Sequence, residues 1–360
     1  MKRIFSIFLV LWLLTNAFCA GNAQEMKNAV SAEGKAEREV WYLELNASAG
    51  WLYVEWKYEN PRVSLIRYDA AGRPLRFTPS KGVYHELFEL SPETVRVEAV
   101  YDKGAQSVRS YRLYGLRELP ADVQNWDEPY EKCDLMLIVA HQDDEWLWFG
   151  GMIPYYELLR GKNVTVVYMA DCGRDRTDEA LAGLWEGGLT HSPVFLGLRD
   201  EKTDYDVTLR HWGGMEAVTD RLTAVIRRYR PEVIVTHGLD GEYGHNQHVI
   251  TAQAVEKAVA RAAEADEVTE GMLYGAWQVK KLYRHEAGSG NVTFDWTLPV
   301  PEKGGKTLFD IAAAAYGKHV SQRGNFTIHN GGEYDNRVFT LVFSAVGRDR
   351  KHDDLFENVG

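Results

Sequence analysis

Cysteine is scarce in this chain, with three among 360 residues: Cys19, Cys133 and Cys172. That is far too few for the disulfide framework of small exported domains. Stability must therefore come from packing, and 45% apolar residues suffice for an ordinary globular core. Cys133 begins one predicted strand and Cys172 follows the end of the next, so we expect two free thiols at opposite sheet ends.

Positive charge is also in short supply. Lysine and arginine number 41 against 52 acidic residues, which gives a net charge of −11. Such a field repels phosphate backbones and anionic lipid surfaces, so we expect no nucleic-acid partner. After the first two dozen residues no stretch is apolar enough for a transmembrane helix, and we expect none in the mature chain.

The N-terminus has the pattern of a secretory signal. A basic start and the apolar run 4–14 precede small residues that end at Ala23. We therefore expect a signal peptide over residues 1–23 and a periplasmic or extracellular protein. Lipid anchoring through Cys19 is the alternative, which the bulky Phe18 just before it disfavours.

The sequence pattern of the next part of the chain predicts β-structure. Aromatic and β-branched residues alternate with polar ones, and turn residues punctuate the pattern, as in a small antiparallel β-sandwich. We assign residues 24–118 to this accessory domain and 119–130, with its prolines and acids, to a linker. Its tryptophans and tyrosines are expected to fill the sandwich core, and a sugar-stacking face is the alternative.

Beyond the linker, in residues 131–360, the spacing of the apolar residues changes from strict alternation to continuous runs. Four apolar runs alternate with helical stretches such as Met215 to Tyr229; the runs are Leu135 to Ala140, Val164 to Ala170, Val194 to Leu198 and Val233 to Thr236. Buried strands that alternate with helices predict an α/β domain with a doubly wound, mostly parallel sheet. Ligands of such sheets bind beyond the carboxyl ends of the strands.

The most distinctive motif is His141-Gln142-Asp143-Asp144-Glu145, directly after the first of these strands. His141 and Asp144 are three residues apart, so one turn can aim both at a single ion while Asp143 points elsewhere. The alternative is that the acids only cap the following helix at its positive end.

A second cluster, Gly241 to His248, follows the strand that ends at Thr236 and contains His245 and His248. Two histidines at a helix start are often plain surface residues, but this cluster is expected at the same sheet edge as the first. His141, Asp144 and His248 together would supply two nitrogens and one oxygen, the ligand set of a catalytic zinc with an open position.

Two common motifs are missing. No Gly-x-Gly-x-x-Gly follows the first strand of the α/β domain, which argues against a dinucleotide-binding oxidoreductase. No His-Glu-x-x-His is present either, which disfavours a metalloprotease.

The two clusters resemble signatures of the PIG-L/LmbE zinc-dependent de-N-acetylases. Ala140 to Glu145 is similar to Ala-His-Pro-Asp-Asp-Glu, and Gly244 to His248 is similar to Gly-His-Pro-Asp-His. The resemblance runs from about Asp134 to the C-terminus and implies a Rossmann-like LmbE fold for this region. It also implies the removal of an N-acetyl group from an N-acetylglucosamine-type sugar or glycoconjugate.

Carried over by position, the resemblance implies roles for five residues. His141, Asp144 and His248 hold Zn²⁺, although another divalent metal is compatible, and Asp143 is the general base. His245 lies beside the leaving group or the oxyanion. These roles are chemically reasonable, because zinc acidifies its water and polarises the amide while an adjacent carboxylate takes the proton.

The resemblance further suggests that Arg176 and Asp200 contact sugar hydroxyls. An ion pair between Arg176 and Glu179 and a plain loop carboxylate at Asp200 are the alternatives. His237 is expected to be a packed residue near the site rather than a ligand. His319 and Gln322 either line the pocket from one helical face or belong to an ordinary helix end.

Two positions depart from the family pattern. Gln142 replaces a proline, and Gln247 replaces an aspartate that is expected to orient a neighbouring histidine. Loss of a carboxylate partner would make that histidine less basic and less firmly held. The sequence thus predicts an exported metal-dependent deacetylase, and the alternative is a metal- and glycan-binding protein on the same fold with little turnover.

Overall fold

In the computed structural model, residues 38–45, 49–59, 63–102, 108–115, 119–265, 274–286, 290 and 292–359 are described. The predicted signal peptide and Cys19 lie outside these residues. The chain divides into two compact units, Met1–Glu128 and Pro129–Gly360.

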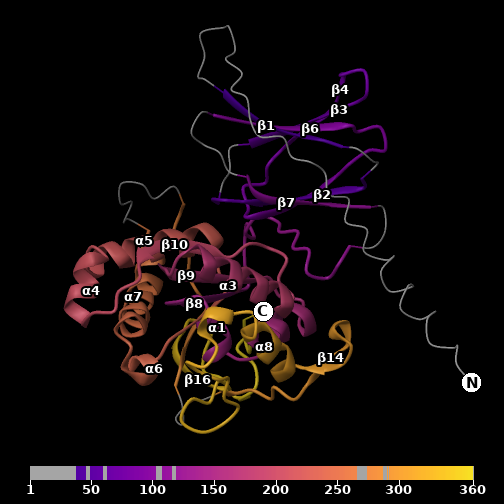
Figure 1. The fold of residues 1–360 in the computed structure, drawn as a ribbon. Coiled ribbons are helices and arrows are strands. Elements are labelled where there is room, and N and C mark those ends of the chain that lie inside the picture. The colour runs from indigo at the N-terminus through magenta and orange to yellow at the C-terminus, as the bar shows by residue number, and fades with distance from the viewer. Residues whose placement is uncertain are drawn as a thin grey trace, which may run out of the picture. The chain divides into compact units, whose positions relative to one another are not determined.

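The N-terminal unit contains two antiparallel sheets, drawn as two layers in Figure 1. Among the described residues, the sheet orders are β1-β6-β3-β4 and β5-β2-β7. The strands are β1 (Arg38–Glu44), β2 (Trp51–Trp56), β3 (Val63–Tyr68), β4 (Pro74–Pro79), β5 (His85–Glu89), β6 (Arg96–Asp102) and β7 (Val108–Tyr114).

Large aromatic side chains fill the core between these sheets. Trp41, Trp56 and Tyr101 are all buried within one apolar cluster. Alternation along a strand sends every second side chain to the inner face, which is how β-branched and aromatic residues come to pack there. The core interpretation of these aromatic residues is therefore confirmed.

The C-terminal unit is built on a mixed sheet. Within the part of the chain that the structure describes, its order is β10-β9-β8-β11-β12-β16-β13, parallel from β10 to β12 and antiparallel at β16 and β13. The strands are β8 (Leu135–Val139), β9 (Val164–Asp171), β10 (Val194–Arg199), β11 (Val233–Thr236), β12 (Lys281–His285), β13 (Val292–Thr293) and β16 (Val338–Ser344). A separate short pair is β14 (Pro299–Val300) and β15 (Lys306–Thr307).

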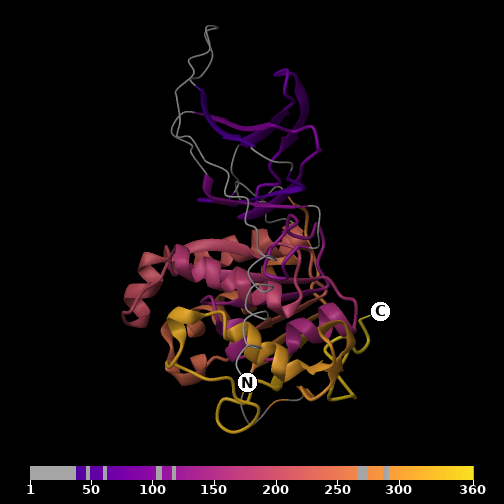
Figure 2. The ribbon, with the colours of Figure 1, turned by 45° about the vertical axis from the view of Figure 1, so that its right-hand side comes forward.

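Helices cover both sides of this sheet (Figures 1 and 2), which confirms the predicted α/β class. The α-helices are α1 (Asp144–Leu147), α2 (Met152–Pro154), α3 (Arg174–Gly187), α4 (Tyr205–His211), α5 (Gly214–Tyr229), α6 (Gly241–Gly244), α7 (Asn246–Ala262) and α8 (Leu308–Tyr316). The shorter helical turns are η1 (Tyr155–Leu159), η2 (Pro301–Lys303) and η3 (Val320–Gln322).

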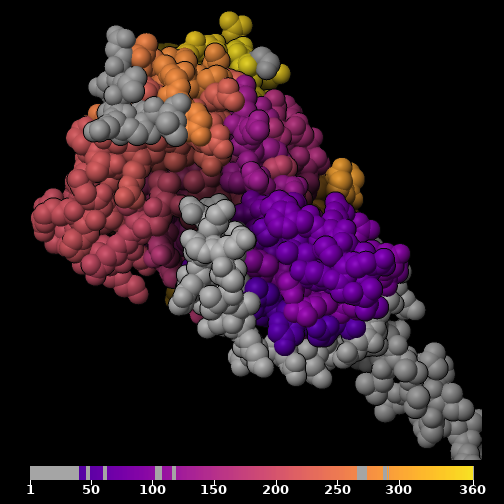
Figure 3. Space-filling view, turned by 90° about the horizontal axis from the view of Figure 1, so that it is seen from above, coloured from indigo at the N-terminus to yellow at the C-terminus, as the bar shows by residue number. Residues whose placement is uncertain are grey.

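The core of this unit follows from its apolar strands. All five residues of β8 are buried, and apolar residues of α5 and α7 pack with strand residues in one cluster. Yellow C-terminal residues lie beside orange ones in Figure 3, and β16 pairs with both β12 and β13. Cys133 and Cys172 are both free, as expected. Among the described residues, no helix combines the length and apolarity that a membrane span requires.

Candidate metal centre

The two predicted clusters meet at one edge of the sheet because β8 and β11 are parallel neighbours. Val233 pairs with Leu135 and Thr236 pairs with Ile138, so both strands end at the same level. The His141 loop then leads into α1, and the loop after β11 leads through α6 into α7. Parallel register therefore brings together residues that lie about a hundred positions apart in the sequence.

Three side chains converge at this edge, and their facing atoms are evenly spaced. Nδ1 of His141 lies 3.2 Å from Nε2 of His248 and 3.3 Å from Asp144 Oδ2, and His248 Nε2 lies 3.4 Å from Asp144 Oδ1. Donors about 2.0–2.1 Å from a tetrahedral zinc are separated by about 3.3 Å. The Asp144 carboxylate faces one nitrogen with each of its oxygens, so the three side chains lie close enough together to hold one divalent ion.

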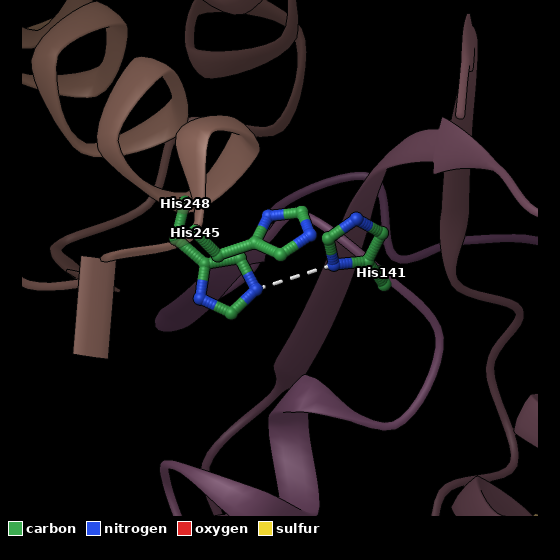
Figure 4. Close-up of side chains that lie close together, drawn as sticks. All are labelled: His141, His245 and His248. Carbon is green, nitrogen blue, oxygen red and sulfur yellow. Dashed lines mark hydrogen bonds between the residues drawn. The ribbon is translucent and has the colours of Figure 1, made fainter. Parts of the chain in front are cut away.

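The outer nitrogens of the two histidines have hydrogen-bond acceptors. His248 Nδ1–H donates to Glu242 Oε2 at 2.7 Å, and His141 Nε2–H donates to Gln247 Oε1. The amide of Gln247 is oriented because its Nε2 donates to the Glu201 carbonyl. The two nitrogens that face each other lie at hydrogen-bond distance, 3.2 Å (Figure 4), so either a proton or a metal ion between them satisfies both.

Asp144 is fixed from two sides. Its Oδ2 accepts from the backbone N–H of His141 at 2.7 Å, and its Oδ1 accepts from Trp148 Nε1 at 2.9 Å. Burial by itself would raise the pKa of Asp144, but His248 and His141 hold that pKa well below its usual range. Asp144 is therefore an anion at neutral pH.

Asp143 points away from this donor set, toward α3. Its Oδ1 lies 2.9 Å from Nη2 of Arg176, and the same guanidinium donates to the Gln142 carbonyl. The side chain makes no capping bond to α1, so the helix-cap alternative is wrong for Asp143. Its φ of 132° is in the region that favours glycine, and its N–H donates to Glu145 Oε2 at 3.0 Å.

His245 precedes α7 and caps it. Its Nδ1 accepts from the backbone N–H of Gln247 at 3.3 Å, which leaves Nε2 as the protonated nitrogen. Burial and the neighbouring His248 and His141 lower the pKa of His245 to about 3, so the ring is neutral. Its ring centroid lies 4.7 Å from that of His141 and 4.7 Å from that of His248.

The remaining predicted residues are distributed unevenly. Asp200, with a side chain 33% exposed, lies 3.8 Å from His141 Nε2 at the rim of the site. The alternative ion pair between Arg176 and Glu179 is wrong, because Arg176 contacts Asp143 and Glu179 accepts from Ser321.

His319 and Gln322 do not share a face. His319 is fully buried, 3.6 Å from Glu145 Oε1, whereas the amide of Gln322 donates to Ser321 Oγ in an exposed setting. The one-face interpretation of this pair is therefore wrong.

His237 is packed near the site, as expected, and is fully buried. It also lies close enough to Asp144 and His248 to count as a ligand candidate. However, its Nε2 accepts from the backbone N–H of Ala140 at 3.0 Å, so that nitrogen is already engaged.

Two contacts were not anticipated from the sequence. Gln247 reaches His141, on the other strand end, rather than its neighbours His245 or His248. Glu242, which the sequence analysis did not single out, contacts His248, His237 and His285. The one available signal was that His237 and His285 also stand at the ends of β11 and β12, the edge where ligands of parallel sheets bind.

Comparison with known proteins gives a consistent family. The PIG-L model, described as GlcNAc-PI de-N-acetylase, matches residues 136–259. A 1D-myo-inositol 2-acetamido-2-deoxy-alpha-D-glucopyranoside deacetylase of Mycolicibacterium smegmatis is 31% identical over 201 residues, which are 46% of this chain and 67% of the relative. The enzyme of the same name from Rhodococcus jostii is 28% identical over 291 residues, which are 63% of this chain and 98% of the relative.

A solved structure is also similar, N,N'-diacetylchitobiose deacetylase from Pyrococcus horikoshii, with a TM-score of 0.41 and 18% identity over 54% of this chain and 72% of that one. The matched family segment contains His141, Asp143, Asp144, His245 and His248, the residues whose geometry is described above. From the family match and the identity to the relatives, we conclude that this chain belongs to the PIG-L family of de-N-acetylases.

Proposed function

We propose that this protein hydrolyses the N-acetyl group of an N-acetylglucosamine-type amino sugar or glycoconjugate, with a divalent metal at His141, Asp144 and His248. The observation that carries the proposal is the pair of histidine nitrogens that face each other 3.2 Å apart beside an anionic carboxylate. Such an arrangement favours a positive charge between the nitrogens, which a divalent metal would supply. The curated relatives, named as deacetylases of an N-acetylglucosamine-containing substrate, support the choice of reaction.

Zinc is the metal that we propose, because two imidazoles and one carboxylate are a common catalytic zinc set with room for one more ligand. When bound, it would acidify a water molecule and polarise the amide carbonyl. Every other contribution comes from side chains of the chain itself.

Asp143 is the proposed general base. It lies next to the ligand Asp144 in the sequence but directs its carboxylate elsewhere, toward Arg176. Burial and the charge of Asp144 raise the pKa of Asp143, and Arg176 opposes that rise. The net result is a pKa of about 8 for Asp143, so the carboxylate becomes available to take a proton from the attacking water as the pH rises toward that value.

His245 is the proposed oxyanion donor. A neutral ring with its proton on Nε2 can donate a hydrogen bond to the oxygen that becomes negative as water attacks the amide. The same neutral ring has no spare proton for the departing amine. The tautomer thus favours the oxyanion role over the leaving-group role.

Asp200 and Arg176 are the proposed sugar contacts. Asp200, partly exposed beside His141, would accept a hydrogen bond from a hydroxyl of the sugar. Arg176, whose side chain is 15% exposed beside Asp143, would contact a second hydroxyl.

We also propose that the protein is exported and that its N-terminal sandwich is an accessory domain. The basic start and apolar run support cleavage after Ala23, and the sandwich of residues 24–118 would serve as an accessory domain. N-terminal sequencing of protein secreted by a bacterial host tests the first point. A mature N-terminus at Gln24 is expected, and one at Cys19 would indicate the lipoprotein alternative.

The activity test is acetate release from a panel of N-acetylglucosamine glycosides by zinc-reconstituted protein. Asp143→Asn and His248→Ala are expected to abolish release, while Asp206→Asn, an exposed aspartate on α4, is expected to behave as wild type. If wild type released no acetate yet bound one zinc that His248→Ala could not hold, the binding-protein alternative would replace the hydrolase.

A further inference from the structure

Glu242 is a carboxylate in an unusual position. It belongs to the short helix α6, yet its side chain is only 1% exposed and turns inward beneath the proposed metal ligands. Buried carboxylates are costly unless their oxygens are satisfied by hydrogen-bond donors. The hydrogen-bond donors around Glu242 therefore indicate the role of this buried carboxylate.

Three imidazoles from three elements converge on this carboxylate. Oε2 accepts from Nδ1–H of His248 at 2.7 Å and from Nδ1–H of His237 at 3.0 Å. Oε1 accepts from His285 at 3.2 Å and from the backbone N–H of Gly238 at 3.2 Å. Glu242 thus joins the ends of β11 and β12 to the start of α7.

The bond to His248 decides which nitrogen faces the metal position. In its neutral form the imidazole of His248 carries one hydrogen, and Glu242 holds it on Nδ1, so that Nε2 then presents its lone pair toward His141 and Asp144. Without Glu242, the favourable tautomer is the opposite one. Nε2–H would then donate to Asp144 Oδ1, 3.4 Å away, and would compete with a metal ion.

The backbone also shows that this placement is enforced. Glu242 has φ 60° and ψ −69°, a conformation that residues with a side chain rarely adopt. Such strain persists where surrounding contacts over-determine it. Here the four hydrogen bonds to the carboxylate supply that constraint.

We propose that Glu242 is a positioning residue that fixes the Nδ1–H tautomer of His248 and thereby sets the affinity of the site for its metal. The inference rests on the metal site of the proposed function but not on the substrate. It assigns the glutamate of the Gly-Glu-Tyr-Gly turn a role that differs from those of the ligands and of the base.

The first test is zinc affinity, measured by competition with a chromogenic chelator on the full chain without substrate. Glu242→Gln replaces one carboxylate oxygen with an NH₂ group, which cannot accept the two N–H hydrogen bonds made to that oxygen. Zinc affinity is therefore expected to fall about 10- to 100-fold. The matched control is Glu157→Gln, a carboxylate of the same unit that accepts from Tyr130 and the Val164 N–H, away from the ligands. This control is expected to keep wild-type affinity.

The second test reads the tautomer directly. Nitrogen-15 NMR of the metal-free protein, at a pH where the ring is neutral and with His248→Ala for assignment, is expected to show Nδ1–H in wild type and Nε2–H in Glu242→Ala. A loss of thermal stability without this change would mark a merely structural role and overturn the proposal.

The outcomes separate the two proposals. Wild-type zinc affinity in Glu242→Gln would overturn this inference alone, whatever the activity. Weakened zinc binding in a protein that deacetylates nothing would uphold the inference and reject the hydrolase. A wild-type chain that binds no zinc would overturn both.

Discussion

The guanidinium of Arg176 lies 2.9 Å from the carboxylate of Asp143 and joins the first turn of α3 to the loop after β8. This contact gives the proposed base a positive neighbour in a buried setting, where opposite charges favour the ionised form. The contact limits the rise in the pKa of Asp143 that burial and Asp144 cause, and the resulting pKa is about 8.

Arg176→Gln removes that charge, so the pKa of Asp143 rises and more of it is protonated at a given pH. We expect kcat/KM at neutral pH to fall about tenfold or more and to recover as the pH is raised, a shift of the acid limb toward alkaline pH. A pH series of initial rates measures this. The control is Arg174→Gln, which breaks an ion pair with Asp178 on the same helix. It is expected to leave the pH dependence of kcat/KM unchanged.

Gln247→Leu tests the contact from α7 to His141. The variant leaves the Nε2–H of the buried His141 without an acceptor, so we expect the free energy of unfolding to fall by about 1–3 kcal/mol. We also expect zinc affinity to fall about tenfold or more. Gln253→Leu on the same helix, where the amide accepts from Tyr205, should destabilise without altering zinc affinity. Equal zinc binding by the two variants would contradict the role of Gln247.

Phe326→Ala tests an aromatic wall beside the centre. Phe326 lies 5.0 Å from the ring of Tyr243, which is 43% exposed and itself 5.6 Å from the rings of His245 and His248. Flat rings bind the apolar faces of sugars, so KM is expected to rise about three- to tenfold with little change in kcat. Phe343→Ala, on the partly exposed face of β16, is the control, and a fall in kcat alone would argue against stacking.

Both cysteines are expected to be unreactive. Burial raises the pKa of Cys133 and of Cys172 to about 12, so about one thiol in ten thousand is ionised at pH 8. A chromogenic disulfide reagent should report almost no fast thiol in the folded chain from Gln24 onward, and two after denaturation. The rate should grow about tenfold per pH unit, because the thiolate is the reactive form. A fast thiol at pH 7 would contradict the assigned burial.

The sequence by itself determined the class of fold and the chemistry of the centre. Buried strands such as β8 are recognisable because a strand covered on both faces must be apolar throughout, and polar clusters at their ends are where parallel sheets bind ligands. The cluster of His141 to Glu145 and the pair His245 and His248 were therefore readable as one candidate site.

The partners of those residues were decided only by the tertiary structure. Which ring nitrogen of His248 faces inward depends on Glu242, and the partner of His141 is Gln247, 106 positions away. A hydrogen bond forms between atoms about 3 Å apart, whatever their separation in the sequence. The local sequence pattern therefore does not reveal such partners. Arg176 was likewise predicted to contact a sugar hydroxyl, with an ion pair to Glu179 as the alternative, and its contact with Asp143 was not foreseen. The packing of neighbouring elements, not spacing along the sequence, sets which charges meet.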